Sequence, residues 1–363
     1  MSGDGDPPSM RDVLDEWRPV VDREIERLLP RVVDEGYLTE FFGEATYRYD
    51  PPAIQQALSD PIWELLDRGG KRWRAVLFLV LTEAFGEDPE AYLPYACIPE
   101  ILHNGTIIVD DVEDDARMRR GDPALHLDHG ADVALNAGNA MYFLPLKIVT
   151  HNPGDLDAET RLAAYEMLMH ELNRTHLGQG MDIWWHNEKE VRVDEGQYLE
   201  MCACKTGCLG RIVARLAALV TDQPDAVEDH VAKYAEEMAI AFQIGDDILD
   251  VEHTLDQAGD FGKAFGNDIK EGKKTLMVIH AAEHATAEDV ARMEDILWAD
   301  ETSDEAVMEV IDIFQKAGSI EYAREQARAL SESACDHLAS LDLEPEPAER
   351  LERFARFVVE RDA

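Results

Sequence analysis

Apolar residues recur at spacings of three and four along most of the chain, which is the period of a helix with one buried face. The pattern is clearest over 11–29, 71–85, 97–112, 160–185, 196–220, 226–249 and 347–362. Strand-like alternation between hairpin turns is absent from the sequence. The pattern therefore predicts an all-α fold.

The breaks between these segments are short polar loops, at 151–158, 221–226, 298–304 and 341–349. None is long enough, or distinct enough in composition, to be a domain linker. The start of the chain, over 1–9, is rich in glycine and proline. We therefore expect a disordered N-terminus over 1–9 and a single helical domain over 10–363.

The chain is strongly acidic, with 76 acidic and 34 basic residues among 363 and a net charge of -42. A surface of this charge repels nucleic acid and anionic membranes, and its self-repulsion weakens the fold at low salt. We interpret the composition as that of a halophilic protein and expect no nucleic-acid partner.

No apolar run approaches the roughly 18 residues that span a bilayer, and the N-terminus has no basic region followed by an apolar one. Five cysteines, an odd number, are typical of a protein whose thiols are reduced. We therefore expect a cytoplasmic protein with no membrane span.

Two Asp-Asp-x-x-Asp motifs each end an apolar helical segment. Their aspartates are Asp110, Asp111 and Asp114 in the first motif and Asp246, Asp247 and Asp250 in the second. With 38 aspartates in the chain, chance placement gives about 0.4 such motifs, so a single copy means little. On a helix the first and last aspartates of each motif share one face, and clustered carboxylates with only oxygen ligands suit Mg²⁺.

The few lysines of the chain gather in short motifs that also carry glycine or arginine. Five of the ten lie in "GGKRWR", "CKTG", "FGKAFG" and "EGKKT", namely Lys71, Lys205, Lys263, Lys273 and Lys274. Four arginines accompany them, Arg72 and Arg74 in the first motif and Arg119 and Arg120 after the first aspartates. Two carboxylate clusters facing across a cleft, with these cations around them, would suit a metal-bridged polyphosphate.

These motifs, in this order, resemble those of the trans-isoprenyl diphosphate synthases, also called polyprenyl synthetases. The resemblance runs from about Trp63 to Thr275 and rests on "GGKRWR", "EILHNGTIIVDDVEDDARMRRG", "LGQGMD", "CKTG", "FQIGDDILD" and "GKAFGNDIKEGKKT", with a weaker echo in "RFARFVVER". The segments "NAGNAMYFL" and "GQGMDIWW" are more similar to geranylgeranyl diphosphate synthases than to bacterial farnesyl enzymes.

The resemblance implies a large bundle of mostly antiparallel helices around a deep central cavity, in a chain that forms a homodimer. It implies a prenyltransferase that joins isopentenyl diphosphate head-to-tail to an allylic diphosphate (dimethylallyl, geranyl or farnesyl). Three Mg²⁺ ions per active site would grip the allylic diphosphate. In this mechanism the allylic C–O bond breaks to a carbocation in a dry pocket, and no nucleophilic side chain is needed.

The resemblance also implies roles for individual residues. Metal binding falls on Asp110, Asp111, Asp114, Asp246, Asp247 and Asp250, with Asp110, Asp114 and Asp246 as the strongest candidates for direct ligands. The allylic diphosphate would contact Arg119, Lys205 and Lys263, and isopentenyl diphosphate would contact Lys71, Arg74, His103 and Arg120, with Arg72 beside them. Thr206 and Gln243 would lie near the ionising carbon, and Lys273 would help to close a loop over the site.

Product length depends on the residues one helical turn before Asp110, because the growing chain would run down that helix. Gly105 and Thr106 stand at these positions, where farnesyl synthases commonly have an aromatic ring. Both residues are small, so we expect the pocket to extend beyond fifteen carbons and the product to be geranylgeranyl diphosphate. A geranylfarnesyl or longer product is the nearest alternative.

Two other classes share part of this pattern. A class I terpene cyclase would mix Asn, Ser or Thr with Glu in its second metal motif and would not need the "GGKRWR" site. A catalytically silent partner subunit typically loses aspartates that this chain retains. Both therefore fit the sequence less well than a synthase.

Overall fold

The computed structural model describes residues 10–188, 190, 192–256 and 266–359. Within these ranges almost every regular element is a helix, which confirms the predicted all-α fold. None of the described helices is both long enough and apolar enough to cross a membrane.

The chain divides into two compact units. Unit 1 comprises 1–168, 212–228 and 343–350, and unit 2 comprises 169–211, 229–342 and 351–363. Four helices carry residues of both units: α10 (Ala158–Asn187), α12 (Cys208–Val220), α13 (Asp225–Asp256) and α19 (Pro345–Phe357). The single helical domain over 10–363 stays a prediction, and the expected disorder of 1–9 lies outside the described residues.

Unit 1 is built around two buried helices, α5 (Trp73–Ala84) and α6 (Leu93–Glu113). Residues 75–81 of α5 are buried on all sides of the helix, because α1 and α6 both pack against it. The other helical elements are α1 (Met10–Leu28), α2 (Glu35–Phe42), α3 (Pro51–Ile54), the π-helical turn η1 (Gln55–Ser59), α4 (Asp60–Asp67), the 3₁₀ turn η2 (Pro89–Tyr92), α7 (Leu125–His129), α8 (Ala131–Phe143) and α9 (Leu146–His151).

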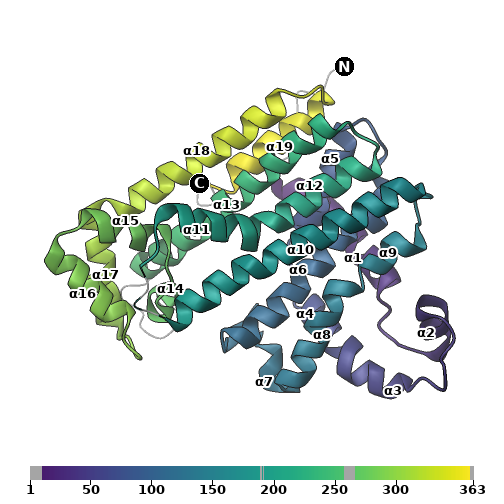
Figure 1. The fold of residues 1–363 in the computed structure, drawn as a ribbon, viewed down its shortest axis with the longest axis horizontal. Coiled ribbons are helices and arrows are strands. Elements are labelled where there is room, and N and C mark those ends of the chain that lie inside the picture. Colours follow the sequence, from purple (N-terminus) through teal and green to yellow (C-terminus); the bar gives the residue numbers. More distant parts are fainter. Residues whose placement is uncertain (1–9, 189, 191, 257–265, 360–363) are drawn as a thin grey trace. The chain divides into compact units, whose positions relative to one another are not determined.

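Unit 2 has its own apolar core. Ile240, Ile244, Ile248 and Val251 form one face of α13 and belong to a cluster that includes residues of α15, α16 and α17. Figure 1 shows these three shorter helices gathered near one end of α18. The elements of unit 2 are α11 (Glu195–Cys202), the π-helical turn η3 (Ala203–Gly207), α14 (Asn267–Glu271), α15 (Leu276–His284), α16 (Ala287–Leu297), α17 (Asp304–Ala317) and α18 (Ser319–Ala339).

A short antiparallel ladder, which the sequence pattern did not indicate, follows α6. Strand β1 (Met118–Arg119) pairs with β2 (Asp122–Pro123). The two residues between them, Arg120 and Gly121, have φ of 54° and 88°, as in the tight hairpin turns that need two left-handed residues. This turn separates the neighbouring arginines, Arg119 on a strand and Arg120 at the turn.

Helices α6 and α8 approach each other closely at two glycines. A Cβ atom on Gly105 would lie 2.7 Å from Met141 Cβ and 2.9 Å from the carbonyl oxygen of Gly138. A Cβ on Gly138 would lie 2.8 Å from a methyl carbon of Val109. The close packing of α8 therefore explains why a glycine stands at 105, independently of any effect of this residue on product length.

Replacing Gly105 with alanine is expected to destabilise the protein. The added methyl group meets backbone of α8, so the two helices must separate at a cost of about 1–3 kcal/mol, which outweighs the roughly 1 kcal/mol gained in helix propensity. Gly196→Ala is the control, because it is also helical and its Cβ would meet only the Asp194 side chain, with Oδ1 at 3.3 Å. Chemical denaturation should show a lower unfolding free energy for Gly105→Ala and little change for Gly196→Ala.

Candidate active site

The first aspartate motif lies where α6 ends, in unit 1. The N–H of Asp114 donates to the carbonyl oxygen of Asp110 at 2.9 Å and closes the last turn. Asp111 is buried, and the Arg119 guanidinium donates to its Oδ1 through Nε at 2.8 Å and through Nη2. Burial opposes the charge of Arg119, but the bond to Asp111 and the nearby carboxylates of Asp110 and Asp114 raise its pKa above the usual value.

The positive charges of four arginines act on His103, which lies two helical turns before Asp110 on α6. Burial, together with the positive charges of Arg74, Arg120, Arg119 and Arg72, lowers the pKa of His103 well below its usual value. The imidazole is therefore neutral at physiological pH and can donate one N–H to an anion. Arginines gathered around a neutral donor are typical of a phosphate site.

Two of these arginines are held by backbone carbonyls and by side chains of unit 1. Arg72 has φ of 53° and is buried; its Nε donates to Asp22 Oδ1 at 2.7 Å and its Nη2 to the Leu66 carbonyl at 3.1 Å. Arg120 donates to the Gly69 carbonyl and, at 3.1 Å, to Asn104 Oδ1. Burial and the charge of Arg72 lower the pKa of Arg120.

Gly70 allows this arrangement, because it has φ of 147° and its missing Cβ would lie 3.1 Å from Arg72 Nη1. The next residue in the motif, Lys71, is exposed. Two of the three cationic residues of "GGKRWR" are thus packed into unit 1, while the third is in contact with solvent.

The fourth arginine, Arg74, lies in the first turn of α5 and stacks on Trp73, with its guanidinium carbon 4.3 Å from the ring centre. The backbone N–H groups of Arg74 and Ala75 donate to Glu100 Oε1 at 3.0 and 3.3 Å. Glu100 is buried on α6, and its carboxylate caps the N-terminus of the neighbouring helix α5. Glu100 and Asn104 were not predicted from the sequence, although two polar residues in an apolar helix next to His103 were a usable signal.

The "CKTG" motif of unit 2 forms a π-helical turn and not the continuous helix that the pattern over 196–220 predicted. The turn η3 spans Ala203–Gly207 and faces Gly178 of α10, where a Cβ atom would lie 2.4 Å from the Lys205 backbone nitrogen. π-Helical turns of this kind often occur at functional sites. Lys205 Nζ donates to Asp182 Oδ2 at 2.5 Å, so the structure adds Asp182 of "LGQGMD" to the predicted residues.

The second aspartate motif lies on α13, in unit 2. Asp247 is buried; its Oδ2 accepts a hydrogen bond from the Tyr198 hydroxyl at 3.0 Å and its Oδ1 accepts one from Gln243 Nε2 at 3.0 Å. The Thr206 hydroxyl donates to Gln243 Oε1 at 3.2 Å. The structure thus brings Thr206, Gln243 and Asp247 together and adds Tyr198, which was not predicted from the sequence.

Asp250 and Lys273 each contact Asp268 of α14. The Asp268 N–H donates to Asp250 Oδ2 at 3.3 Å, and Lys273 Nζ donates to Asp268 Oδ1 at 2.7 Å. Burial and the charge of Asp268 raise the pKa of Asp250 to about 6, and burial likewise raises the pKa of Asp247. Burial opposes the charge of Lys273, but Asp268 and Glu271 raise its pKa. Lys263, predicted to bind diphosphate, lies outside the described residues.

The carboxylates of both motifs suit a divalent cation that shares its ligands with a substrate. Across the described ranges, no three His, Cys, Asp or Glu side chains converge as a preformed metal centre. Mg²⁺ needs no such centre, because it keeps several waters and is commonly held by one or two carboxylates plus phosphate oxygens. The raised pKa values of Asp247 and Asp250 show carboxylates whose charge a cation would stabilise.

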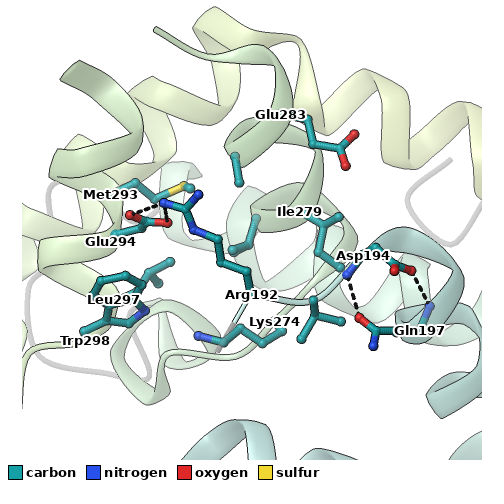
Figure 2. Close-up of a pocket in the computed structure, with 13 residues that line it drawn as sticks. Arg192, Asp194, Gln197, Lys274, Ile279, Glu283, Met293, Glu294, Leu297 and Trp298 are labelled. Carbon is teal, nitrogen blue, oxygen red and sulfur yellow. Dashed lines mark hydrogen bonds and ion pairs between the residues drawn. The ribbon is translucent and has the colours of Figure 1, made fainter. Parts of the chain in front are cut away.

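Unit 2 also contains a cavity of about 300 Å³, and the aspartates of the two motifs do not line it. Figure 2 shows Arg192 crossing it to pair with Glu294, Oε1 of which is 2.7 Å away, and Lys274 pointing toward the same space. At its edge Asp194 and Gln197 form the capping box of α11. Lys274 is one of the cationic candidates named from the sequence, whereas none of the residues predicted to bind metal or diphosphate is among the residues that line this cavity.

Comparison with known proteins gives concordant matches. The sequence model of the polyprenyl synthetase family matches residues 55–314. A geranylgeranyl pyrophosphate synthase of Geoglobus acetivorans is 34% identical over 297 residues, 82% of this chain and 88% of that protein. A geranylfarnesyl diphosphate synthase of Natronomonas pharaonis is 30% identical over 338 residues, 89% and 95% of the two chains. The crystal structure of geranylgeranyl pyrophosphate synthetase from Pyrococcus horikoshii superposes with a TM-score of 0.82 at 29% identity, covering 97% of this chain and 98% of that one.

Proposed function

The chain belongs to the polyprenyl synthetase family, and within that family we propose that it is a geranylgeranyl diphosphate synthase. It is a prenyltransferase of the class that elongates prenyl diphosphates. The proposed reaction joins isopentenyl diphosphate head-to-tail to an allylic diphosphate. The observation that carries the proposal is the cationic cluster beside the first aspartate motif, in which Arg119 donates to Asp111 and Arg120 donates to the Gly69 carbonyl and to Asn104.

We propose that three Mg²⁺ ions are held by the two aspartate motifs, with Asp110, Asp114 and Asp246 as direct ligands. The proposal is supported by a geranylgeranyl pyrophosphate synthase from Corynebacterium glutamicum, which was solved with isoprenyl diphosphate and magnesium, and by the all-oxygen carboxylate ligands, which suit Mg²⁺. When bound, the ions would neutralise the allylic diphosphate and stabilise it as a leaving group. Asp111 has a second role, because its bond to Arg119 holds that guanidinium beside the motif.

The cationic residues would divide between the two diphosphates. We propose that Arg119, Lys205 and Lys263 bind the allylic diphosphate and that Lys71, Arg72, Arg74, His103 and Arg120 bind isopentenyl diphosphate. The partition is supported by the hairpin turn, from which Arg119 reaches Asp111 while Arg120 reaches Gly69 and Asn104. Lys273, paired with Asp268, would help to close a loop over the site, as the family resemblance implies.

The oxygens of Thr206 and Gln243 would face the carbon that ionises. The departing diphosphate takes the electron pair of the allylic C–O bond, and the double bond of isopentenyl diphosphate attacks the resulting carbocation. A proton then leaves the new cation, with the released diphosphate as the proposed acceptor. The side chains of the site exclude water, which would otherwise capture the carbocation.

The proposed function is tested by incubating the purified protein with farnesyl and isopentenyl diphosphates and Mg²⁺ at molar KCl. Mass spectrometry of the dephosphorylated alcohols should give mainly the twenty-carbon product. A twenty-five-carbon product would favour a geranylfarnesyl synthase, whereas hydrolysed or cyclised products without elongation would overturn the proposal. Molar salt is chosen because the net charge of -42 supports a halophilic protein, whose melting temperature should rise with KCl.

Thr106 is a better position than Gly105 for a substitution that tests what limits product length. The Cβ of any residue at Gly105 would meet α8, so Gly105→Phe would disturb packing before it could shorten a product. Thr106 is half-buried, and its hydroxyl donates to the His103 carbonyl at 2.8 Å. Thr106→Phe should shift the product toward fifteen carbons, and Thr106→Ser should leave it unchanged. An unaltered product distribution in Thr106→Phe would mean that the end of the pocket is formed elsewhere.

We also propose that the enzyme is a homodimer, as the family resemblance implies. In unit 2, Met169, Leu177 and Trp184 are exposed at intervals of eight and seven residues along α10, so they follow one face of that helix. A second copy of the chain would cover this face. Light scattering should give a mass near twice 40.8 kDa, and a monomer at working concentrations would contradict the proposal.

A further inference from the structure

Tyr198 is a fully buried residue of α11 that no predicted role uses. Its hydroxyl donates to Asp247 Oδ2 at 3.0 Å, across to α13. The other oxygen of the same carboxylate accepts from Gln243 Nε2, one turn earlier on α13. Both oxygens of Asp247 therefore accept hydrogen bonds from protein donors, one from each of two helices.

The hydrogen bond that Gln243 donates to Asp247 determines how the Gln243 amide is oriented. Because Gln243 Nε2 donates to Asp247, its Oε1 faces the opposite way, where it accepts from the Thr206 hydroxyl at 3.2 Å. A neutral amide can rotate by 180°, and an acceptor held on one side removes that freedom. The network thus runs Tyr198, Asp247, Gln243, Thr206.

Along the chain, one end of this network comes before Lys205 and the other end comes after it. Tyr198 is on α11, before the π-helical turn, and Thr206 is within the turn. Their bonds reach two residues of α13 that are one helical turn apart, Asp247 and Gln243. The segment that carries Lys205 is therefore attached to α13 at two points.

We infer that Tyr198 is a positioning residue for the ionisation step, because it holds Asp247 and thereby fixes the Gln243 amide and the turn that carries Thr206 and Lys205. The inference rests on the proposed function for the roles of Thr206, Gln243 and Lys205. Tyr198 itself touches no substrate in this account. Removing its hydroxyl frees Asp247 to rotate, after which neither Gln243 nor Thr206 keeps a single orientation.

Tyr198→Phe tests the inference, with Tyr234→Phe as a matched control. Tyr234 is also fully buried in unit 2, and its hydroxyl donates to the Leu351 carbonyl at 2.8 Å, with no contact to either aspartate motif. Tyr198→Phe should lower kcat about tenfold, as expected for one misaligned catalytic interaction, without changing KM for isopentenyl diphosphate. Tyr234→Phe should leave both constants unchanged. Equal kcat values in the two variants would overturn the inference.

A second measurement needs no activity and separates this inference from the proposed function. Melting temperatures are compared for Tyr198→Phe, Gln243→Leu and the double variant, with Tyr234→Phe replacing Tyr198→Phe in a parallel set. If Asp247 couples the two residues, the melting temperature of the double variant should fall by less than the sum of the two single decreases. In the Tyr234 set the decreases should be additive. Additivity in both sets would show that Tyr198 and Gln243 are independent. An inactive wild type would overturn the proposed function and leave this comparison intact.

Discussion

Replacing Asp110 or Asp246 with alanine will lower turnover by orders of magnitude while the helix content stays unchanged. Each substitution removes a proposed magnesium ligand, and without the metal the diphosphate is a poor leaving group. Neither substitution should unfold the protein, because each motif loses one of several carboxylates that repel one another. Turnover is measured with farnesyl and isopentenyl diphosphates, and helix content by circular dichroism.

Asp128→Ala is the control for these variants. Asp128 is an exposed residue on α7, outside both motifs, so its loss should leave turnover within a factor of two. Chelation with EDTA should abolish product formation in the wild type, and added Mg²⁺ should restore it. Near-normal turnover of either motif variant would remove that aspartate from the metal site.

Lys205→Ala will slow the chemical step, whereas Lys71→Ala will weaken substrate binding. Charge develops on the allylic diphosphate as its C–O bond breaks, so a cation held there stabilises the transition state more than the ground state. Loss of Lys205 should cost about a hundredfold in kcat. The diphosphate of isopentenyl diphosphate carries the same charge throughout the reaction, so Lys71→Ala or Arg74→Ala should mainly raise KM for that substrate.

Two further variants make this comparison specific. Lys316→Ala removes an exposed lysine paired with Asp312 and should change neither constant. Lys205→Ala also deprives Asp182 of its partner at 2.5 Å, so thermal unfolding is needed to show that the variant is folded. If Lys71→Ala lowered only kcat, or Lys205→Ala raised only KM for isopentenyl diphosphate, the assignment of the two diphosphates would be reversed.

Several features of the fold and of the site could be read from local sequence. Helices follow from apolar periodicity, and the segment over 97–112 falls within α6, from Leu93 to Glu113. The aspartate motifs follow from spacing within one helix, and the cationic motifs from the scarcity of lysine elsewhere. These signals involve residues within a few positions of one another, so the chain shows them without its tertiary structure.

Backbone irregularities were harder to predict, because their causes lie outside the segment. The periodicity over 196–220 indicated one helix, yet the close approach of Gly178 accompanies a π-helical turn at Lys205. Helix α13 continues to Asp256, and α14 forms between Gly266 and Gly272, both with positive φ. Glycine permits such conformations but does not by itself specify them.

Local sequence identified most of the candidate residues and the helices that carry the two aspartate motifs. What each candidate contacts depends on the tertiary structure, because helices far apart in the chain must first be rotated and packed together. Tyr198 and Asp247 are 49 residues apart, and Lys205 and Asp182 are 23 apart. Gly105 shows the same limit: its small size is visible in the sequence, but its contact with Gly138 and Met141 depends on which face of α6 meets α8. Helical period specifies a face, and packing alone specifies its partner.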